Sequence, residues 1–460
     1  MPVTTSSDGL PLPRRYGAIA AIALGITVAV LDGTIANVAL PTIARELQAS
    51  PAESIWIINA YQLAIIISLL SFSFLGDLLG YRRIYQGGLL LFSATSLLCA
   101  FSDSLGMLTF ARVLQGFGGA ALMSVNTALI RIIYPQRYLG RGMAINALIV
   151  AVSSAAGPTV AAAILAVTSW KWLFLINVPA GMLALLLAWR FLPDNTQKSS
   201  PTQRFDITSA VMNALTFGLL LSALSGAAQG QDYRLIVAEL LALLLVGTLF
   251  IRRQLRMTFP LLPVDLLRIP IFSLSICTSI CSFLAQMLAM VSLPFFLQSV
   301  LGRSEVETGL LLTPWPLATM VMSPIAGRLL ERFHAGLLGG IGLAVFAFGL
   351  FALAWLPAAP TDGDIIWRMI LCGAGFGLFQ SPNNHTIISA APRHRSGGAS
   401  GMLGTARLLG QTSGAALVAL MFNLFDTQGT HASLLLAGLF STLAALFSLS
   451  RLRQPLQKPS

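Results

Sequence analysis

The chain of 460 residues is 56% hydrophobic and only 10% charged, whereas charged residues make up about 25% of an ordinary soluble domain. Its 28 basic and 17 acidic residues are too few to cover a soluble protein of this length, which excludes a soluble enzyme, a nucleic-acid-binding domain and a disordered chain. Several apolar runs reach the roughly 20 residues that cross a bilayer, so the sequence predicts an all-α polytopic membrane protein. The net charge of +11 then reflects topology, because cytoplasmic loops collect lysine and arginine, and no nucleic-acid partner is expected.

The first segment, 1–16, is polar and contains Pro11 and Pro13. It lacks the features of a removable signal peptide, so we expect a cytoplasmic tail. Fourteen apolar runs follow, separated by polar or by proline- and glycine-containing breaks, and each predicts a membrane-spanning helix. The predicted helices are 17–41, 54–77, 83–101, 106–129, 140–167, 170–191, 206–228, 233–252, 270–297, 307–330, 336–356, 364–391, 397–424 and 432–450.

The distribution of basic residues supports this count. Of the 28 lysines and arginines, 21 fall in segments assigned to the cytoplasm and two fall inside predicted helices. The five in outer segments are Arg45, Lys171, Arg234, Arg303 and Arg368. If one helix had been missed, every later loop would be assigned to the wrong side of the membrane, and the excess of basic residues in the cytoplasmic segments would disappear. This excess therefore predicts fourteen spans with both termini cytoplasmic.

An internal repeat predicts how the helices are grouped. Residues 116–157 align without gaps with residues 373–414, which pairs helices four and five with helices twelve and thirteen. A shift of eight helices predicts two six-helix halves separated by two extra helices, an arrangement of transporters that bind substrate between the halves. The expected segments are the tail 1–16, a six-helix half 17–195, two inserted helices 196–260, a second half 261–452 and a cytoplasmic tail 453–460.

Charged residues inside the predicted helices are functional hypotheses, because a charge within a membrane is costly. Asp32, in the first helix, could exchange protons or make a structural hydrogen bond. Arg112 and Arg407 could each pair with an acid, bind backbone carbonyls or contact substrate. Glu239 competes with Asp32 as the proton site, or extends outward to the membrane surface. His385 could titrate near neutral pH, but a satisfied polar group in a helix interface is its expected role.

A short turn between the second and third predicted helices carries Gly76, Asp77, Gly80, Arg82 and Arg83. The glycines permit a tight turn with close backbone approach. Asp77 is placed to meet a helix amino terminus or an arginine. We expect this contact to act as a gate that latches the cytoplasmic side.

These segments resemble the major facilitator superfamily, and specifically its fourteen-span drug:proton antiporter family. The turn 76–83 matches the superfamily's signature between helices two and three, and residues 32–41, with Asp32 and Asn37, match the family's first-helix motif. Residues 108–119, with Arg112 and Gln115, resemble the fourth-helix motif, and residues 170–181 resemble the aromatic segment before helix six. The resemblance spans essentially the whole chain.

The resemblance implies the major facilitator fold and a role for particular residues. Gly157 and Pro158 match the antiporter motif of helix five, although Ala161–Ala162 follows where the family commonly has two glycines. Alanine is still small, so close helix packing should survive. Asp32, Arg112 and Glu239 are the candidates for proton coupling, and the candidates for a substrate-binding or structural role are Asn37, Gln115, His385 and Arg407.

The leading hypothesis is a proton-coupled antiporter of the bacterial inner membrane that exports lipophilic, cationic drugs or biocides by alternating access. A carboxylate facing a methionine- and phenylalanine-rich cavity would suit such ligands. Export of an endogenous metabolite or siderophore is the alternative, and no residue separates the two. A membrane-embedded enzyme or receptor is a remote third reading, since no nucleophile–base set or large soluble segment is present.

The cysteines Cys99, Cys277, Cys281 and Cys372 lie in apolar runs without a Cys-x-x-Cys pair, so no metal or cofactor is expected. The expected form is a monomer whose partners are protons, a small-molecule substrate and the lipid bilayer.

Overall fold

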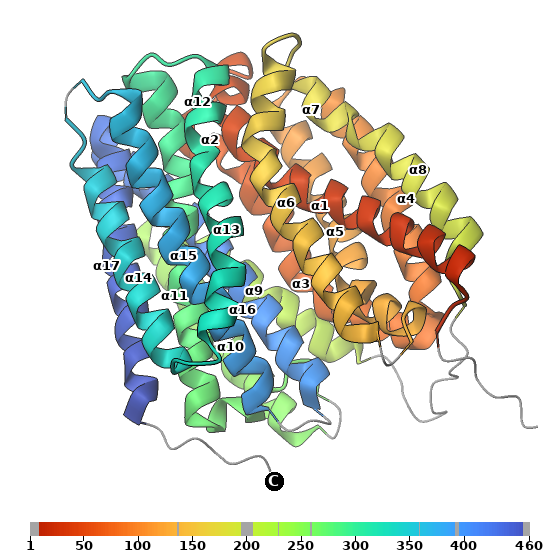
Figure 1. Cartoon of the computed structure of the whole chain (residues 1–460). Coiled ribbons are helices and arrows are strands. Elements are labelled where there is room, and N and C mark those ends of the chain that lie inside the picture. Colours follow the sequence, from red (N-terminus) through yellow and green to blue (C-terminus); the bar gives the residue numbers. More distant parts are fainter. Residues whose placement is uncertain are drawn as a thin grey trace, which may run out of the picture.

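The computed structural model describes residues 9–135, 138–194, 206–228, 230–257, 260–357, 359–391 and 395–453. Within these ranges the chain is helical and contains no β-strand, as the composition predicted (Figure 1). Much of the two predicted tails, 1–8 and 454–460, lies outside the described residues, as do residues 195–205.

The long helices are α1 (Leu12–Glu46), α3 (Trp56–Leu79), α4 (Tyr81–Ala100), α5 (Leu105–Ile133), α6 (Leu139–Leu165), α8 (Asn177–Phe191), α9 (Ile207–Ala228), α10 (Tyr233–Arg256), α11 (Pro270–Phe295), α13 (Pro314–Leu329), α14 (Ala335–Ala354), α15 (Asp362–Ala390), α16 (Ser396–Phe425) and α17 (Gly429–Ser450). The short helical segments are α2 (Pro51–Ser54), α7 (Lys171–Leu175), η2 (Val264–Arg268), η3 (Phe296–Val300), α12 (Glu305–Leu312), η5 (Asp426–Gln428) and η6 (Arg451–Arg453).

These helices give fourteen long segments in the described part of the chain, because α2 leads into α3, α7 into α8 and α12 into α13. Twelve of the segments are long and apolar enough to cross a membrane. The other two are α4, which carries Arg82 and Arg83 in its first turn, and α15, which begins with Asp362 and Asp364. The number of helices is therefore the predicted one.

The first helix differs from the prediction at its start. α1 begins at Leu12, whereas the apolar pattern predicted a start at residue 17. Pro11 is the N-cap and Pro13 lies in the first turn, where a helix needs no backbone N–H donor. Polar residues that were expected in the tail thus extend the helix.

The helices form two groups that lie side by side, α1–α8 in red to yellow and α11–α17 in green to blue (Figure 1). The groups meet where α6 contacts α12 and α13, where α1 contacts α11 and α12, and where α16 contacts α3. Between them in sequence, α9 and α10 form a helical hairpin. α9 packs against α3 and α16 and so covers the seam between the groups, and Asn213 of α9 donates to the Ile67 carbonyl oxygen of α3 at 3.1 Å.

Close packing recurs at equivalent places in the two groups. A Cβ on Gly118 of α5 would lie 2.8 Å from a backbone nitrogen of α4, and one on Gly375 of α15 would lie 2.5 Å from a backbone nitrogen of α14. Two residues earlier, Gly116 and Gly373 similarly face the backbones of α3 and α13. Because the sequence repeat pairs these same glycines, the repeat has a counterpart in helix packing.

Candidate functional site

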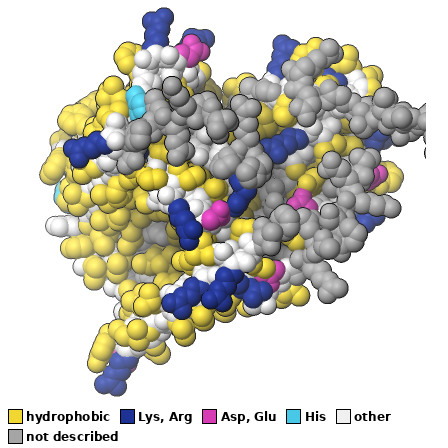
Figure 2. All heavy atoms as spheres, turned by 90° about the horizontal axis from the view of Figure 1, so that it is seen from below, with side chains coloured by type: hydrophobic (Ala, Val, Ile, Leu, Met, Phe, Trp, Pro, Cys, Tyr) yellow, Lys and Arg dark blue, Asp and Glu magenta, His cyan; other side chains and the backbone are white. Residues whose placement is uncertain are grey.

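A cavity of about 690 Å³ lies between the two groups of helices. Its lining includes Asp77 and Tyr81, so it reaches the turn between α3 and α4, at the end of the molecule that is lower in Figure 1. Its wall comes from α1, α3, α4, α5 and α6 on one side and from α11, α15 and α16 on the other. The wall mixes apolar side chains such as Leu69 and Phe283 with polar ones such as Ser124 and Gln380. Seen from below, this end of the molecule is notched, and basic side chains are more frequent on it than acidic ones (Figure 2).

The opposite end is closed by polar contacts on α1. Glu305, at the start of α12, accepts a hydrogen bond from the Thr42 hydroxyl at 2.6 Å and pairs with Arg45 at 3.2 Å. Gln298 of η3 donates to the Val38 carbonyl oxygen at 3.1 Å. Sequence reasoning missed Glu305, because an acid at the edge of a predicted loop carries no signal until its partner on another helix is known.

The proposed antiporter motif lies in this closed region. A Cβ on Gly157 would collide with Thr34 of α1, so α6 and α1 approach closely there. On the neighbouring face, a Cβ on Gly309 of α12 would lie 2.6 Å from the Pro158 carbonyl oxygen and 2.7 Å from the Ala162 side chain. α6 is therefore held between α1 and α12, and the small side chain of Ala162 is compatible with that packing.

Asp32 lies in a sealed polar cluster inside the first group of helices. Its carboxylate forms an ion pair with Arg112 of α5 at 2.5 Å, and both side chains are only 1% exposed. The other carboxylate oxygen accepts hydrogen bonds from Asn177 of α8 at 2.7 Å and from Gln115 of α5 at 3.1 Å. Asp32 does not line the central cavity, which differs from the expected carboxylate facing the substrate.

The guanidinium of Arg112 also contacts other members of this cluster. It donates to Gln115 at 2.6 Å and to the Ile57 carbonyl oxygen of α3 at 3.1 Å. It also lies over the Tyr61 ring, 4.1 Å from its centroid. Four helices therefore meet at one buried charge pair, and Tyr61 is a member that the sequence did not reveal.

The predicted gating turn lies at the lower end, beside the mouth of the cavity. Gly80 has φ +102°, which an L side chain rarely adopts, and this explains the glycine at that position. Asp77 accepts a hydrogen bond from the Tyr81 hydroxyl, and Asp77 and Tyr81 both line the cavity. Arg82 instead pairs with Asp194 at 3.1 Å, and Arg83 is exposed.

Comparison with known proteins identifies the fold and the family. The sequence pattern described as the Major Facilitator Superfamily matches residues 22–415 and 277–459. The chain belongs to the major facilitator superfamily. It is a multi-pass membrane transporter and not an enzyme.

Several major facilitator relatives resemble this chain along most of its length. The uncharacterized transporter YebQ of Escherichia coli (strain K12) is 73% identical over 449 residues, with 98% of both chains covered. The multidrug efflux pump LfrA of Mycolicibacterium smegmatis is 31% identical, with 92% of this chain and 85% of the relative covered. The riboflavin transporter RibZ of Clostridioides difficile is 28% identical, with 89% of both covered.

Solved structures confirm the major facilitator fold. An inward-facing bacterial homolog of the human lysosomal transporter Spinster superposes with a TM-score of 0.71 at 16% identity, covering 96% of this chain and 97% of that one. The xylose transporter XylE from E. coli superposes with a TM-score of 0.65 at 14% identity, covering 96% of this chain and all of the other.

The remaining candidate residues lie at separate places in the major facilitator fold. Glu239 of α10 accepts a hydrogen bond from Ser222 of α9 at 2.6 Å, away from the central cavity. Asn37 of α1 has a buried Oδ1 atom without a hydrogen-bond partner among the described residues. His385 is exposed rather than satisfied in a helix interface, and it does not line the cavity. Arg407 does line the cavity.

Proposed function

We propose that this chain is a fourteen-span antiporter of the bacterial inner membrane, which exports small amphipathic organic molecules in exchange for protons. Relatives named as multidrug efflux pumps or multidrug resistance proteins support the export of drug-like compounds. The substrate occupies the cavity between the two groups of helices, and Asp32 carries the proton. The positive charge first expected of the substrate is not part of this proposal, because Asp32 is neutralised by Arg112 and lies outside the cavity wall.

The observation that carries the proposal is the buried ion pair between Asp32 and Arg112. A proton on Asp32 removes the carboxylate charge and thereby the attraction that joins α1 to α5. Arg112 keeps its bonds to Gln115 and Ile57, whereas α1 loses its strongest contact with the cluster. Protonation therefore changes how firmly α1 is held.

α1 also reaches the closed end, where it carries Thr42 and Arg45. At 1.5 Å per residue, Asp32 is separated from these two residues by roughly 15–20 Å of helix. A movement of α1 on protonation would be transmitted to the contacts with Glu305, which hold that end shut. This linkage between the proton site and the closed end is the proposed basis of alternating access.

The test follows proton movement in lipid vesicles that contain the purified protein. A compound exported by the wild type is first chosen from a panel, in a strain stripped of its own efflux pumps. Adding this compound should release protons, detected by a pH-sensitive dye. Asp32→Asn should abolish the release, because its amide cannot exchange a proton, and Asp32→Glu should retain part of it with a shifted pH optimum.

Glu239→Gln is the matched control, because it removes the competing acid at a site between α9 and α10. Its proton release should remain at the wild-type level. Loss in Glu239→Gln with full release in Asp32→Asn would move the coupling site to α10. Full proton-coupled export by Asp32→Asn would refute the proposed mechanism.

Transport of an endogenous metabolite is a second candidate function. It is favoured by the similarity to a protein named as a riboflavin transporter, which extends over 89% of both chains. Including riboflavin and other metabolites in the compound panel separates this candidate from drug export.

A further inference from the structure

Arg407 is a cation in the wall of the central cavity, and the described residues form no ion pair with it. It lies on α16 between Leu403, Gly404 and Leu408, which line the same cavity. Its Nε atom is buried and has no hydrogen-bond partner within the described part of the chain. Because a buried polar group without a partner is costly, a bound ligand would complete this position.

Two fully buried arginines, Arg112 and Arg451, show how an arginine with a structural role is bound in this protein. Arg112 has an acid, a glutamine and a carbonyl oxygen as partners. Arg451 of η6 donates to Asn383 at 2.8 Å and to Ser275 at 3.0 Å. Both are satisfied by the protein itself, whereas the buried Nε atom of Arg407 has no such partner among the described residues.

Among the described residues that line the cavity, Asp77 is the only acid. The other charged residues in its described wall are Asp77 and Arg131, which lie on the α3 and α5 segments near the lower mouth. Asp77 already accepts a hydrogen bond from Tyr81. The described charge in the depth of the cavity is therefore positive.

The rest of the wall suits the body of an organic molecule. Leu69, Met123 and Phe283 supply apolar surface, and the amides of Gln380 and Asn384 add polar groups. A volume of about 690 Å³ falls within the range of small-molecule sites, roughly 300–1,000 Å³. The cavity thus combines the guanidinium of Arg407 with walls that are largely apolar.

We propose that the cavity binds a soluble amphipathic organic anion, with its carboxylate, sulfonate or phosphate on Arg407 and its apolar body against Phe283 and Met123. The planar guanidinium fork matches a carboxylate or phosphate in a bidentate way. The same charge repels a lipophilic cation, so the substrate class differs from the one that the first-helix carboxylate suggested. This inference rests on the proposed function only in taking the cavity as the substrate site.

The first experiment measures the charge of the cavity without a substrate. Ser400→Cys places a thiol on the cavity wall. Its reaction rates are compared for two methanethiosulfonate reagents of similar size, one with a sulfonate and one with a trimethylammonium group. Their ratio reports the local potential, because any change in thiol reactivity affects both rates equally. The native Cys277 is only partly buried, so its contribution is measured in protein without the added cysteine and subtracted.

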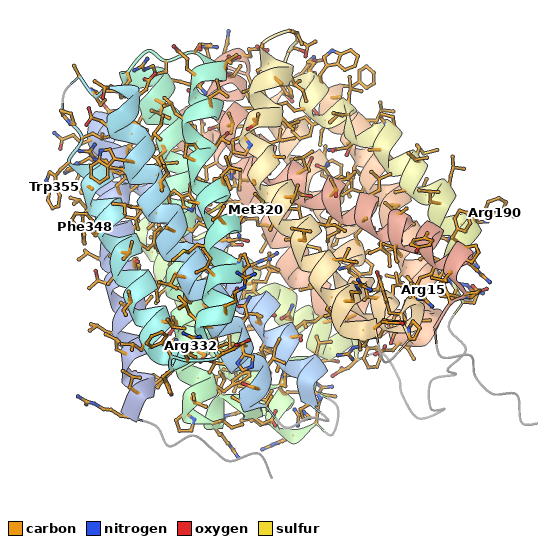
Figure 3. The ribbon with its side chains drawn as sticks, in the orientation of Figure 1. Arg15, Arg190, Met320, Arg332, Phe348 and Trp355 are labelled. Atoms are coloured by element: carbon orange, nitrogen blue, oxygen red, sulfur yellow. The ribbon has the colours of Figure 1, made fainter. Side chains whose placement is uncertain are left out.

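The sulfonate reagent should react faster in the wild-type background, and Arg407→Gln should lower the ratio about tenfold. Arg407→Lys should preserve it, because the charge is kept. Arg332→Gln is the matched control, since Arg332 is exposed in the turn after α13 and does not line the cavity (Figure 3). A wild-type preference for the trimethylammonium reagent would overturn the proposal even if Arg407→Gln does not fold. An unchanged ratio in folded Arg407→Gln would do the same.

The second experiment uses a ligand pair, 2-naphthoate and 2-naphthylmethylammonium, with protein in nanodiscs of zwitterionic lipid. Unfolding is followed with a thiol-reactive dye, because Cys99, Cys281 and Cys372 are buried in the folded protein. Naphthoate at millimolar concentration should raise the unfolding temperature of the wild type and of Arg332→Gln, but not of Arg407→Gln. The ammonium compound should have no such effect.

Equal or greater stabilisation by the ammonium compound, or no stabilisation by naphthoate, would overturn the assignment. Loss of the naphthoate effect in nanodiscs that contain anionic phosphatidylglycerol would assign the site to a lipid headgroup and reject the soluble anion. These readouts involve no proton gradient. Proton-coupled export of cations would therefore defeat this inference alone, whereas anion binding without proton coupling would defeat the proposed function.

Discussion

At the scale of single residues, burial decides how strongly a charge is tied to its partner. Asp32 and Arg112 are each 1% exposed, so water does not screen their attraction. The side chain of Arg45 is 72% exposed, and its pairing with Glu305 is worth at most about 1 kcal/mol. The first pair can fix the position of a helix, whereas the second can be broken and remade in each transport cycle.

Removing one member of the buried pair should destabilise the protein more than removing both. Arg112→Gln leaves the Asp32 carboxylate buried without its cation, at a cost of about 3–5 kcal/mol. Adding Asp32→Asn removes the stranded charge and should recover part of the loss. The measurement is thermal unfolding of both variants in detergent. A double variant no more stable than Arg112→Gln alone would show that the ion pair does not dominate the cluster.

At the scale of helices, glycine determines how closely α6 and α12 approach at the closed end. A Cβ on Gly309 would lie 2.6 Å from the Pro158 carbonyl oxygen, a backbone atom that cannot turn aside. By contrast, a Cβ on Gly327 of α13 would meet no atom within 4 Å. A methyl group added at Gly309 would therefore collide with the backbone of α6, whereas one added at Gly327 would meet no neighbouring atom.

Gly309→Ala should separate α6 from α12 and loosen the closed end. A cysteine in place of Val38, which is buried on α1 beneath this end, should then react faster with a membrane-impermeant thiol reagent. Gly327→Ala, the same chemical change at an open position, should leave the rate unchanged. Equal rates in the two variants would mean that the Gly309 contact does not keep this end shut.

The turn between α3 and α4 should control the other end. We expect the Asp77 carboxylate to make a charge-assisted contact in the conformation that is closed at the cavity mouth. Asp77→Asn would remove this contact, which is worth about 1.5–3 kcal/mol, and destabilise that conformation. Transport should fall, while labelling of a cysteine in place of Ser124, on the cavity wall, should rise.

Asp103→Asn serves as the control for this variant, because Asp103 pairs with Lys171 at an exposed site outside the cavity wall. Unchanged labelling together with full transport in Asp77→Asn would remove the gating role of the turn.

At the scale of the whole molecule, a cavity that reaches one end and is sealed at the other is what a transporter needs in one half of its cycle. Arg332 lies toward the end where the cavity opens, and Trp355, beyond the other end of α14, lies well above it (Figure 3). The excess of basic residues predicts that the first of these ends faces the cytoplasm. We therefore expect the structure to be the inward-open form.

This orientation can be tested by labelling single cysteines in intact cells. Cysteines at Arg256, which ends α10, and at Lys198 should be protected from an impermeant reagent, and one at Asp232, before α10, should react. Protection at Asp232 would show that α9 and α10 are not both spans. In that case the plan of six, two and six helices would fail.

The sequence by itself determined the class of protein, the number of helices and the family, because each depends on features repeated along the chain. Long apolar runs specify spans wherever they occur. The paired glycines Gly118 and Gly375 pointed to a duplicated packing that the structure contains. The sequence also singled out Asp32 and Arg112 as candidate functional residues, because a charge inside a membrane is costly.

Only the tertiary structure decided which charges neutralise each other. Asp32 and Arg112 are 80 residues apart and Thr42 and Glu305 are 263 apart, so no local pattern could pair them. The same sequence features predicted that Asp32 would face the substrate, whereas helix packing encloses it with Arg112 and leaves Arg407 on the cavity wall. The charge offered to a substrate depends on which residues remain unpaired after folding, and that is a property of long-range contacts.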